Sequence, residues 1–333
     1  MSPCIEQRFI YVWSGNNFPY VNVLSVLSAT KSHPDAEVLV YVFGADPKTV
    51  WFKYLEDIPQ VSIIRTSPEE LFAQLPQELQ KVARTYEALS PSALSARSNI
   101  LRYVLLYLFG GVYLDFDVFV LRPMDELLNR KAMVGEELVW ADDEARLLGR
   151  RGIYLAPRNI VWAASHCLMW LDSHLMEGRL RLANLLRPTF GFWSRYQMNN
   201  AVIGAAPKNE FIEQLLLGAV EANTTVRYAT GPTLIDKVVR LQKSDVDVRP
   251  ADDFYAVPPG QSYRLFYDKC LTLPESAYLI HYAASNHPGF VSEFNPLQGV
   301  EFDKETVMGS ILHGLSEEMR LLTSHQTRLL NHA

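Results

Sequence analysis

The sequence predicts an α/β protein built on a doubly wound, mostly parallel sheet into which a largely helical subdomain is inserted. Strand-like and helix-like segments alternate over about the first hundred residues, which is typical of a parallel sheet with crossover helices. The alternation resumes after Arg195, where a segment of different composition ends. The 333 residues, 48% of them hydrophobic, provide enough apolar material for a large core.

Three short apolar runs near the start are the first predicted strands. Each is followed by a segment with helical periodicity, or by a proline placed where a helix can begin. We expect strands at 8–15, 37–44 and 61–66. We expect helices at 22–30, at 48–56 and from Pro68 onward. A ligand of such a sheet binds beyond the carboxyl ends of its strands.

The most regular helix covers residues 92–109 and is apolar nearly all round, which predicts that it is buried. Gly110 and Gly111 end it, because glycine is favoured just past a helix C-terminus. The run GVYLDFDVFVLRP then reads as a strand, a short acidic turn and a second extended piece. Further downstream we expect extended segments at 200–207, 245–259 and 277–285, and helices at 209–220, 230–242 and 305–333.

Charge and cysteine content exclude several classes of protein. The net charge of −6 does not indicate a nucleic-acid partner. Cys4, Cys167 and Cys270 are odd in number, far apart and without a C-x-x-C pair, so neither a disulfide framework nor a zinc cluster is predicted. The first residues do not read as a signal peptide, and the longest apolar run is too short to span a bilayer. We expect a cytoplasmic protein that can lie against a membrane, with no oligomeric state indicated.

The segment 141–196 is expected to be the inserted subdomain. Between Arg146 and Arg195 it contains eight arginines, no lysine and two acidic residues, a net charge of +6 against −12 for all other residues. It also contains three of the six tryptophans, which are Trp162, Trp170 and Trp193. Three interpretations stay open: a solvated helical face, a seat for an anionic or lipid-linked acceptor, and a patch that lies on an anionic membrane.

Two carboxylates, Asp115 and Asp117, follow an apolar strand directly. The alternation of a strand puts both on one side and turns Phe116 back toward the core. Two carboxylates at so short a separation repel each other unless a cation or a hydrogen-bonding ligand lies between them. Mg²⁺ or Mn²⁺, bound by carboxylate and phosphate oxygens, meets that need. The alternative is a solvated turn, because the D-x-D tripeptide is weak support for a site when taken alone.

The helix that precedes this turn has a single polar stripe. Ser95, Asn99 and Arg102 are spaced i, i+4 and i+7 on an otherwise apolar surface. Because only a few residues join the stripe to the acidic turn, both are expected to face one cavity. A buried arginine needs an anionic partner. Arg102 is therefore predicted either to bind a ligand in that cavity or to form a structural salt bridge with an internal carboxylate.

The run SNILRYVLLYLFGGVYLDFDVFVLRPMDEL resembles the signature of glycosyltransferase family 32 and its relatives. These include α-1,4-galactosyltransferases, yeast-type mannosyltransferases, bacterial capsule and lipopolysaccharide transferases, and the glucosylating domains of clostridial toxins. The pieces VWSG, NNAVIGAAPKNEF, ATGPTLI, DDFYAVP and LIHYAAS extend the resemblance along the chain in family order. The resemblance implies a single GT-A domain over 1–333, a nucleotide-sugar donor and, typically, retention of anomeric configuration.

The resemblance also implies roles for the residues of the turn and the stripe. Asp115 would contact the ribose and sugar of the donor, and Asp117 together with Asp115 would ligate Mn²⁺ or Mg²⁺. Arg102 would bind sugar hydroxyls or the diphosphate. Asn99 stands where the family commonly has Asp, which removes one negative charge from the donor pocket and bears on the rate or on the choice of sugar. An amide can still donate to and accept from sugar hydroxyls.

Residues elsewhere in the chain complete the implied site. Trp13 matches an aromatic residue that stacks on the nucleotide base, with a core tryptophan as the alternative. His281 matches a histidine that completes the metal and diphosphate site, with a purely structural histidine as the alternative. Asn199 and Asn200 match donor-binding positions on the wall of the site near the acceptor. Gly231, with the proline after it, is expected to open a helix.

The implied activity is transfer of a hexose from a nucleotide-sugar, with UDP-sugars favoured, to a hydroxyl of a glycan, a glycolipid or another acceptor. No residue stands out as a covalent nucleophile. Two alternatives stay open: a sugar-binding protein with impaired catalysis, and a secreted effector that glycosylates a host protein. An oxidoreductase is disfavoured because SGNN is not a G-x-G-x-x-G loop. A glycoside hydrolase is disfavoured because it needs carboxylates roughly 5 Å or more apart across a sugar.

Overall fold

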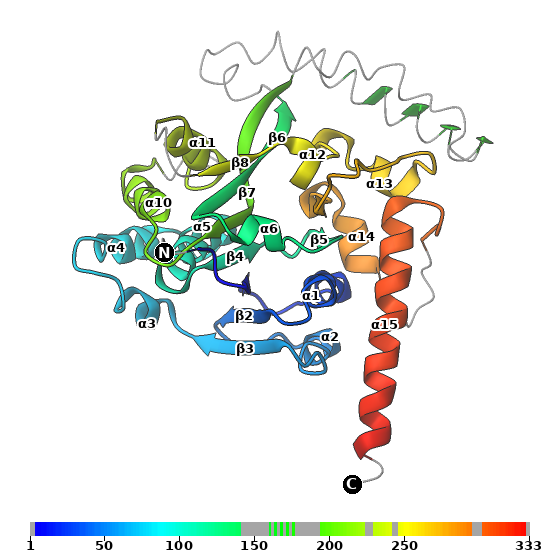
Figure 1. Ribbon diagram of the computed structural model, residues 1–333, viewed down its shortest axis with the longest axis horizontal. Helices are drawn as coiled ribbons and strands as arrows, with labels where there is room; N and C mark the ends of the chain where they lie inside the picture. Colours follow the sequence, from blue (N-terminus) through cyan, green and yellow to red (C-terminus); the bar gives the residue numbers. More distant parts are fainter. Residues whose placement is uncertain are drawn as a thin grey trace.

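The centre of the protein is a seven-stranded sheet with the order β3-β2-β1-β4-β7-β6-β8 (Figure 1). The computed structural model describes residues 4–140, 194–223, 229–241, 246–294 and 302–330, together with isolated positions between 160 and 176. Most of the segment 141–196 lies outside the described residues, so its expected role as an inserted helical subdomain stays a prediction.

Neighbouring strands of the sheet run parallel except at β7, which is antiparallel to both β4 and β6. The predicted α/β class and mostly parallel sheet are therefore confirmed, with one antiparallel strand inside the sheet. The strands are β1 (Arg8–Trp13), β2 (Glu37–Phe43), β3 (Val61–Thr66), β4 (Gly111–Leu114), β6 (Ala132–Trp140), β7 (Ser194–Ala205) and β8 (Asp247–Arg249).

Helices cover both faces of this sheet and create two apolar cores. Successive residues of β1 alternate between them, with Phe9 and Tyr11 in one core and Ile10 and Val12 in the other. The first core is lined by α1 (Tyr20–Ser32) and α15 (Val307–Leu330). The second is lined by α4 (Lys81–Ala88), α5 (Leu94–Phe109), α10 (Glu210–Glu221) and α11 (Pro232–Leu241). Shorter helices are α2 (Val50–Lys53), α3 (Pro68–Phe72), α6 (Asp125–Leu128), α12 (Ala251–Phe254), α13 (Arg264–Tyr267) and α14 (Pro288–Glu293).

The junction between α5 and β4 depends on two glycines. Gly110 has φ +64° and Gly111 has φ +109°, values that side chains rarely adopt. A β-carbon on Gly110 would lie 2.5 Å from Cδ of Pro207, and one on Gly111 would lie 2.7 Å from the carbonyl oxygen of Arg8. These two glycines let the buried helix lead straight into the strand that ends at the acidic turn.

A second, two-stranded sheet lies next to the acidic turn. Strand β5 (Val118–Val120) pairs antiparallel with β9 (Leu279–His281), and Val118 lies opposite His281. Because β5 begins directly after Asp117, this pairing brings His281 to the turn. Helix α15 runs along one side of the molecule and packs on α1 (Figure 1). Within the part of the chain that is described, no helix is both long and apolar enough to cross a bilayer.

Some predicted boundaries are wrong. The helix expected at 48–56 is limited to α2, and turns follow it. Strand β7 starts well before the predicted 200–207, because its first half is polar and reads as loop. Strand β6 was not predicted, since two adjacent acidic residues interrupt its apolar pattern. The segments expected to be extended, 245–259 and 277–285, also contain short helices, α12 in the first and a 3₁₀ turn from Ala284 in the second.

Candidate active site

The acidic turn joins β4 to β5. Phe116 packs into the core as predicted, with its ring centroid 4.9 Å from that of Tyr11. The N–H of Asp115 donates to the carbonyl oxygen of Ala201 at 2.8 Å, which ties the turn to β7. The side chains of Asp115 and Asp117 remain 29% and 19% exposed. Both carboxylates are therefore held in place and still open to a ligand.

Arg102 holds Asp115 through a two-pronged ion pair. Nη2 of Arg102 lies 3.1 Å from Oδ1 of Asp115, and Nη1 lies 3.3 Å from Oδ2. The hydroxyl of Tyr113 donates to Oδ1 at 2.6 Å, and the guanidinium lies 4.2 Å from the centroid of the Tyr113 ring. Nη1 also donates to the carbonyl oxygen of Asn200. Arg102 thus forms the internal salt bridge that was one of its two predicted roles, and its direct contact with a donor stays a prediction.

The predicted polar stripe on α5 is only partly buried. Asn99 and Arg102 are 3% and 4% exposed, whereas Ser95 is exposed at the start of the helix. Ser98, one helical turn before Arg102, contacts it: its hydroxyl accepts from Nη2 at 3.4 Å. The stripe therefore reaches the acidic turn through Ser98, Asn99 and Arg102.

Asn99 and Asn200 belong to one buried amide network. Nδ2 of Asn200 donates to Oδ1 of Asn99 at 2.7 Å, and Nδ2 of Asn99 donates to the hydroxyl of Thr230 at 3.4 Å. Gly231 packs against this network, since a β-carbon there would lie 2.7 Å from Nδ2 of Asn99. Helix α11 begins at Pro232, so the predicted role of Gly231 at a helix start is confirmed. Contact of Asn99 or Asn200 with a donor stays a prediction.

Asp117 is held by residues from β9 and the loop after it. Nε2 of His281 lies 3.2 Å from Oδ2 of Asp117, and the N–H of Ala284 donates to the same oxygen at 2.9 Å. Ala283 has φ +52°, a left-handed conformation that is uncommon outside glycine, and it turns the chain so that the next N–H points at Asp117. The N–H of Tyr282 donates to the carbonyl oxygen of Asp117 at 3.0 Å.

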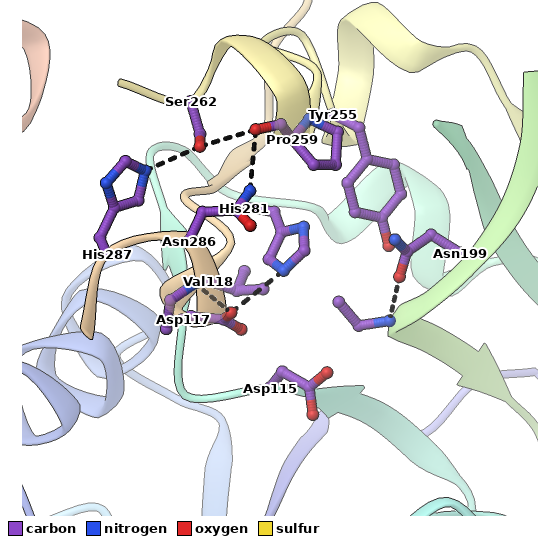
Figure 2. A network of polar contacts seen from close by, with 12 residues as sticks. Asp115, Asp117, Val118, Asn199, Tyr255, Pro259, Ser262, His281, Asn286 and His287 are labelled. Atoms are coloured by element: carbon purple, nitrogen blue, oxygen red, sulfur yellow. Dashed lines mark hydrogen bonds and ion pairs between the residues drawn. The ribbon is translucent and has the colours of Figure 1, made fainter. Parts of the chain in front are cut away.

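The loop after β9 is itself anchored by side chains. Nδ2 of Asn286 donates to the carbonyl oxygen of Pro259 at 2.9 Å, and Nε2 of His287 lies 2.8 Å from the hydroxyl of Ser262 (Figure 2). Figure 2 shows these contacts on the side of His281 away from Asp115. The anchors explain how the left-handed turn at Ala283 is kept in place.

Glu137 on β6 completes a chain of polar contacts behind His281. Its Oε1 lies 3.2 Å from Nδ1 of His281, and its Oε2 accepts from Nδ2 of Asn199. The ring of Tyr255 meets the imidazole edge-on, with centroids 5.7 Å apart. The sequence reasoning missed both Glu137 and Tyr255. The signal for Glu137 was an acidic pair inside the otherwise apolar run AMVGEELVW, which a strand would divide between a buried and a more exposed face.

Asn199 and Asn200 are adjacent on β7 but belong to different groups of polar side chains. Side chains alternate along a strand, so Asn199 reaches Glu137 while Asn200 reaches Asn99. Oδ1 of Asn199 accepts from the N–H of Ala201 at 2.7 Å, which fixes the orientation of its amide (Figure 2). Strand β7 therefore links the side chains around Arg102 to those around His281.

The titratable groups of the turn have pKa values shifted in different directions. Burial raises the pKa of Asp115, and the charge of Arg102 offsets only part of that effect. Burial also opposes ionisation of Asp117, but His281 and the N–H of Ala284 outweigh it and hold the pKa of Asp117 below its ordinary value. Burial disfavours a charged His281, yet Asp117 and Glu137 raise its pKa well above the ordinary value. The two aspartates therefore have different electrostatic environments, as paired carboxylates with different roles do.

Trp13 lies at the end of β1 and is partly buried. Its ring meets Phe18 and Phe116 edge-on, with centroids 5.0 Å and 5.5 Å away. Its Nε1 donates to the carbonyl oxygen of Gly15 at 3.1 Å. These contacts are the core packing that was the alternative reading of Trp13. Stacking on a nucleotide base stays a prediction.

The arrangement around Asp117 fits a substrate-bridged divalent ion. Among the described residues, no group of three or more His, Cys, Asp or Glu side chains is placed to enclose a metal. Mg²⁺ in phosphate-binding sites does not need such an enclosure, because it takes one or two carboxylates and completes its shell with phosphate oxygens and water. Asp117 and His281 supply one oxygen and one nitrogen from two directions, and a carboxylate bonds the other ring nitrogen, as it commonly does behind metal-bound histidines. Asp115 is bonded to Arg102, so its role as a second ligand stays a prediction.

Comparison with known proteins points to the part of the chain that contains the acidic turn. A family model described as "Glycosyltransferase sugar-binding region containing DXD motif" matches residues 21–134. That range contains α5, β4 and the acidic turn. The chain is similar to this family over that range. The resemblance seen in the sequence is confirmed over residues 21–134.

The similar proteins match mainly in part of the chain. Lactosylceramide 4-alpha-galactosyltransferase of Rattus norvegicus is 30% identical over 127 residues, which are 36% of this chain and 35% of that protein. Initiation-specific alpha-1,6-mannosyltransferase of Candida albicans is 36% identical over 69 residues, 21% of this chain and 16% of that protein. The chain thus spans about a third or less of these curated relatives. Among solved structures, PaToxG glycosyltransferase is 18% identical with a TM-score of 0.45, over 72% of this chain and 71% of that chain.

Asn99→Asp is expected to change the ranking of donor sugars or the rate, while the fold stays intact. A carboxylate has the shape of the amide and can accept from both Asn200 and the rotatable hydroxyl of Thr230, but it adds a negative charge to this buried network. Hydrolysis rates over a panel of nucleotide-sugars would measure the effect. An unchanged ranking and rate, or a donor complex in which Asn99 faces away from the sugar, would contradict this expectation.

Proposed function

We propose that this protein is a metal-dependent glycosyltransferase that moves a hexose from a nucleotide-sugar to an acceptor hydroxyl with retention of configuration. UDP-sugars are the favoured donors. One observation carries the proposal: Asp115 and Asp117 lie in one turn but are held by different partners, Arg102 and His281. A turn of this kind can offer one carboxylate to the sugar and the other to a metal-bound diphosphate. The family of the region 21–134 supports a sugar donor.

Different residues at the turn would bind different parts of the donor. A Mn²⁺ or Mg²⁺ ion held by Asp117 and His281 would supply the positive charge that balances the diphosphate. Asp115 is fixed by Arg102 and Tyr113 with its side chain 29% exposed, so it can accept hydrogen bonds from hydroxyls of the donor. The charge of Arg102 lies beside it and adds to the stabilisation of the departing diphosphate.

The proposed reaction forms no covalent intermediate on the protein. The acceptor hydroxyl attacks the anomeric carbon from the face that the diphosphate leaves, and the bond between that carbon and the phosphate oxygen breaks. The proton of the hydroxyl passes to an oxygen of the departing phosphate. The products are the glycosylated acceptor and a nucleoside diphosphate, which gives the reaction a convenient readout.

A screen of UDP- and GDP-sugars tests this function. Release of nucleoside diphosphate would be followed with Mn²⁺, with Mg²⁺ and with excess EDTA, with and without candidate acceptors. We expect metal-dependent release from at least one donor. Full turnover in EDTA would contradict the metal role. Saturable binding of a nucleotide-sugar with neither hydrolysis nor transfer would favour the alternative of a sugar-binding protein.

We also propose that the acceptor is anionic or lipid-linked and that the arginine-rich segment from Arg146 to Arg195 governs its binding. Most of that segment lies outside the described residues, so the proposal stands on its charge of +6 and its tryptophans. Arginine favours bidentate contacts with phosphate or carboxylate groups. Flat indole rings suit sugar rings or the headgroup region of a cytoplasmic membrane surface.

Neutralising Arg150, Arg151 and Arg158 together to Ala should weaken acceptor use or liposome binding, most strongly at low salt. Donor hydrolysis should stay near its original rate. The matched control replaces three exposed basic residues elsewhere, Lys53, Lys81 and Arg84, and should change neither property. A triple variant that lost donor hydrolysis and kept acceptor affinity would assign the segment to the donor site instead.

A further inference from the structure

His281 lies between two carboxylates that face different parts of the protein. Its Nε2 faces Oδ2 of Asp117 at 3.2 Å, on the side of the proposed diphosphate site. Its Nδ1 faces Oε1 of Glu137 at 3.2 Å, on the side of β6. The side chain of Glu137 is 4% exposed. A buried acid in this position touches the histidine and the protein, and no part of the proposed reaction yet uses it.

Asn199 determines what Glu137 can do. Oδ1 of Asn199 accepts from the N–H of Ala201 at 2.7 Å, so its Nδ2 must be the group that faces Glu137. Gly135 pairs with Asn199 and Glu137 pairs with Gln197 in the register of β6 and β7, which makes Asn199 and Glu137 diagonal neighbours on one face. Glu137 therefore receives a donor from Asn199, and its second oxygen is left to accept from His281.

We propose that Glu137 is a positioning residue that keeps a proton on Nδ1 of His281, so that Nε2 is the nitrogen that gives up its proton and offers a lone pair to the metal and diphosphate. The inference rests on the proposed function, because it assigns Nε2 to metal binding. Which ring nitrogen of a histidine binds a metal is set by the hydrogen bond that the other nitrogen makes. A carboxylate that can only accept forces Nδ1 to be the donor.

The fixed amide of Asn199 makes Glu137→Gln a sharp test. Glutamine has nearly the shape of glutamate but carries both a donor and an acceptor. Two amide NH₂ groups cannot face each other, so Gln at position 137 must turn its oxygen toward Asn199 and its NH₂ toward Nδ1 of His281. Nδ1 then has to accept, and the proton moves to Nε2, where it blocks the lone pair. We expect Mn²⁺ affinity in the presence of UDP to fall roughly 10- to 100-fold.

A second change should restore the tautomer without restoring Glu137. In Glu137→Gln with Asn199→Asp, the new carboxylate accepts from the N–H of Ala201 and from the NH₂ of Gln at position 137. The glutamine oxygen then faces Nδ1 of His281 and accepts from it, as Glu137 did. The total charge equals that of the wild type. Mn²⁺ affinity should return to within about threefold of the wild-type value, that is within about 0.7 kcal/mol.

The experiment is a titration of each full-length protein with Mn²⁺ at saturating UDP, in which electron paramagnetic resonance reports free Mn²⁺. Thermal unfolding checks that each variant is folded. The matched control is Glu136→Gln, which removes the same charge from the neighbouring, more exposed position on β6 and should leave the affinity unchanged.

Weak binding by Glu137→Gln together with recovery in the double variant supports the proposal. Wild-type affinity in Glu137→Gln overturns it, and so does equally weak binding by the double variant, because the negative charge at position 137 would then be what matters. If Glu137→Gln does not fold, the double variant decides: near-wild-type Mn²⁺ affinity supports the proposal, and weak binding overturns it. A wild-type protein that binds no Mn²⁺ with UDP would defeat the proposed metal role itself, whereas tight wild-type binding with an indifferent Glu137→Gln defeats only this inference.

Discussion

Asp117→Asn is expected to abolish metal-dependent hydrolysis of a nucleotide-sugar in a protein that stays folded. Asparagine keeps the shape of the side chain and can still accept from the N–H of Ala284, but it lacks the negative charge that pairs with a cation and with His281. A catalytic metal supplies several kcal/mol of charge stabilisation. We expect the rate to fall at least about 100-fold, equivalent to about 2.7 kcal/mol. The measurement is nucleoside diphosphate release over a range of Mn²⁺ concentrations.

The control for this variant is Asp35→Asn, which changes an exposed aspartate in the turn between α1 and β2. It should have the wild-type rate and the same dependence on Mn²⁺. Far-ultraviolet circular dichroism and thermal unfolding would show whether Asp117→Asn keeps the fold. A folded Asp117→Asn protein with wild-type turnover would remove Asp117 from the metal site.

Arg102→Lys is expected to lower donor binding or turnover at least roughly tenfold, about 1.4 kcal/mol. The guanidinium bonds both oxygens of Asp115, lies on the ring of Tyr113 and reaches the carbonyl oxygen of Asn200 at the same time. A lysine ammonium is a single point charge and cannot keep that geometry. Asp115 would lose its fixed orientation, so the effect should be larger on donor hydrolysis than on the melting temperature.

The matched control is Arg97→Lys on the same helix. Arg97 lies over the ring of Tyr86 and donates to the carbonyl oxygens of Tyr86 and Leu89, away from the acidic turn. Its replacement should leave donor hydrolysis unchanged. If Arg102→Lys were equally silent in kinetics, Arg102 would be a structural salt bridge alone. A drop in stability without any kinetic change would lead to the same conclusion.

The parts of the fold that could be predicted from the sequence are those with long and regular patterns. The strand at 8–13 is a short continuous apolar run and the helix at 94–109 is a long segment that is apolar nearly all round, and the glycine pair after that helix marks its end. Phe116 could be placed in the core because the alternation of a strand extends through the acidic turn. Local patterns of this kind do not depend on which distant segment packs against them.

The pairing of distant strands could not be predicted in the same way. Strand β6 was missed because Gly135 and an acidic pair break its apolar pattern. Gly135 is needed there because a β-carbon would lie 2.7 Å from the rings of both Phe254 and Tyr255. The buried role of Glu137 depends on His281 and Asn199, which reach it only through strand pairing. No periodicity within residues 132–140 contains that information.

The two predicted roles of Arg102 show a further limit of sequence reasoning. A buried guanidinium requires a negative partner, but the sequence does not say whether the partner is a neighbouring aspartate or a ligand. The structure supplies Asp115 as one partner. For Trp13 the structure shows edge-on packing against Phe18 and Phe116. The sequence pattern could not indicate whether a face of the indole ring is also open for stacking on a base.

The pairing of β5 with β9 determines when during synthesis the site can form. Asp117 and His281 are 164 residues apart, and a contact between such distant residues costs more loop-closure entropy than a local one. The ribosome releases the N-terminal part of a chain first, so β1 to β4 and the acidic turn emerge while β9 is still unmade. A nascent chain therefore carries both aspartates without the histidine or the Ala284 N–H that holds Asp117. The arrangement around Asp117 can therefore form only after residue 284 has been added and β9 has paired with β5.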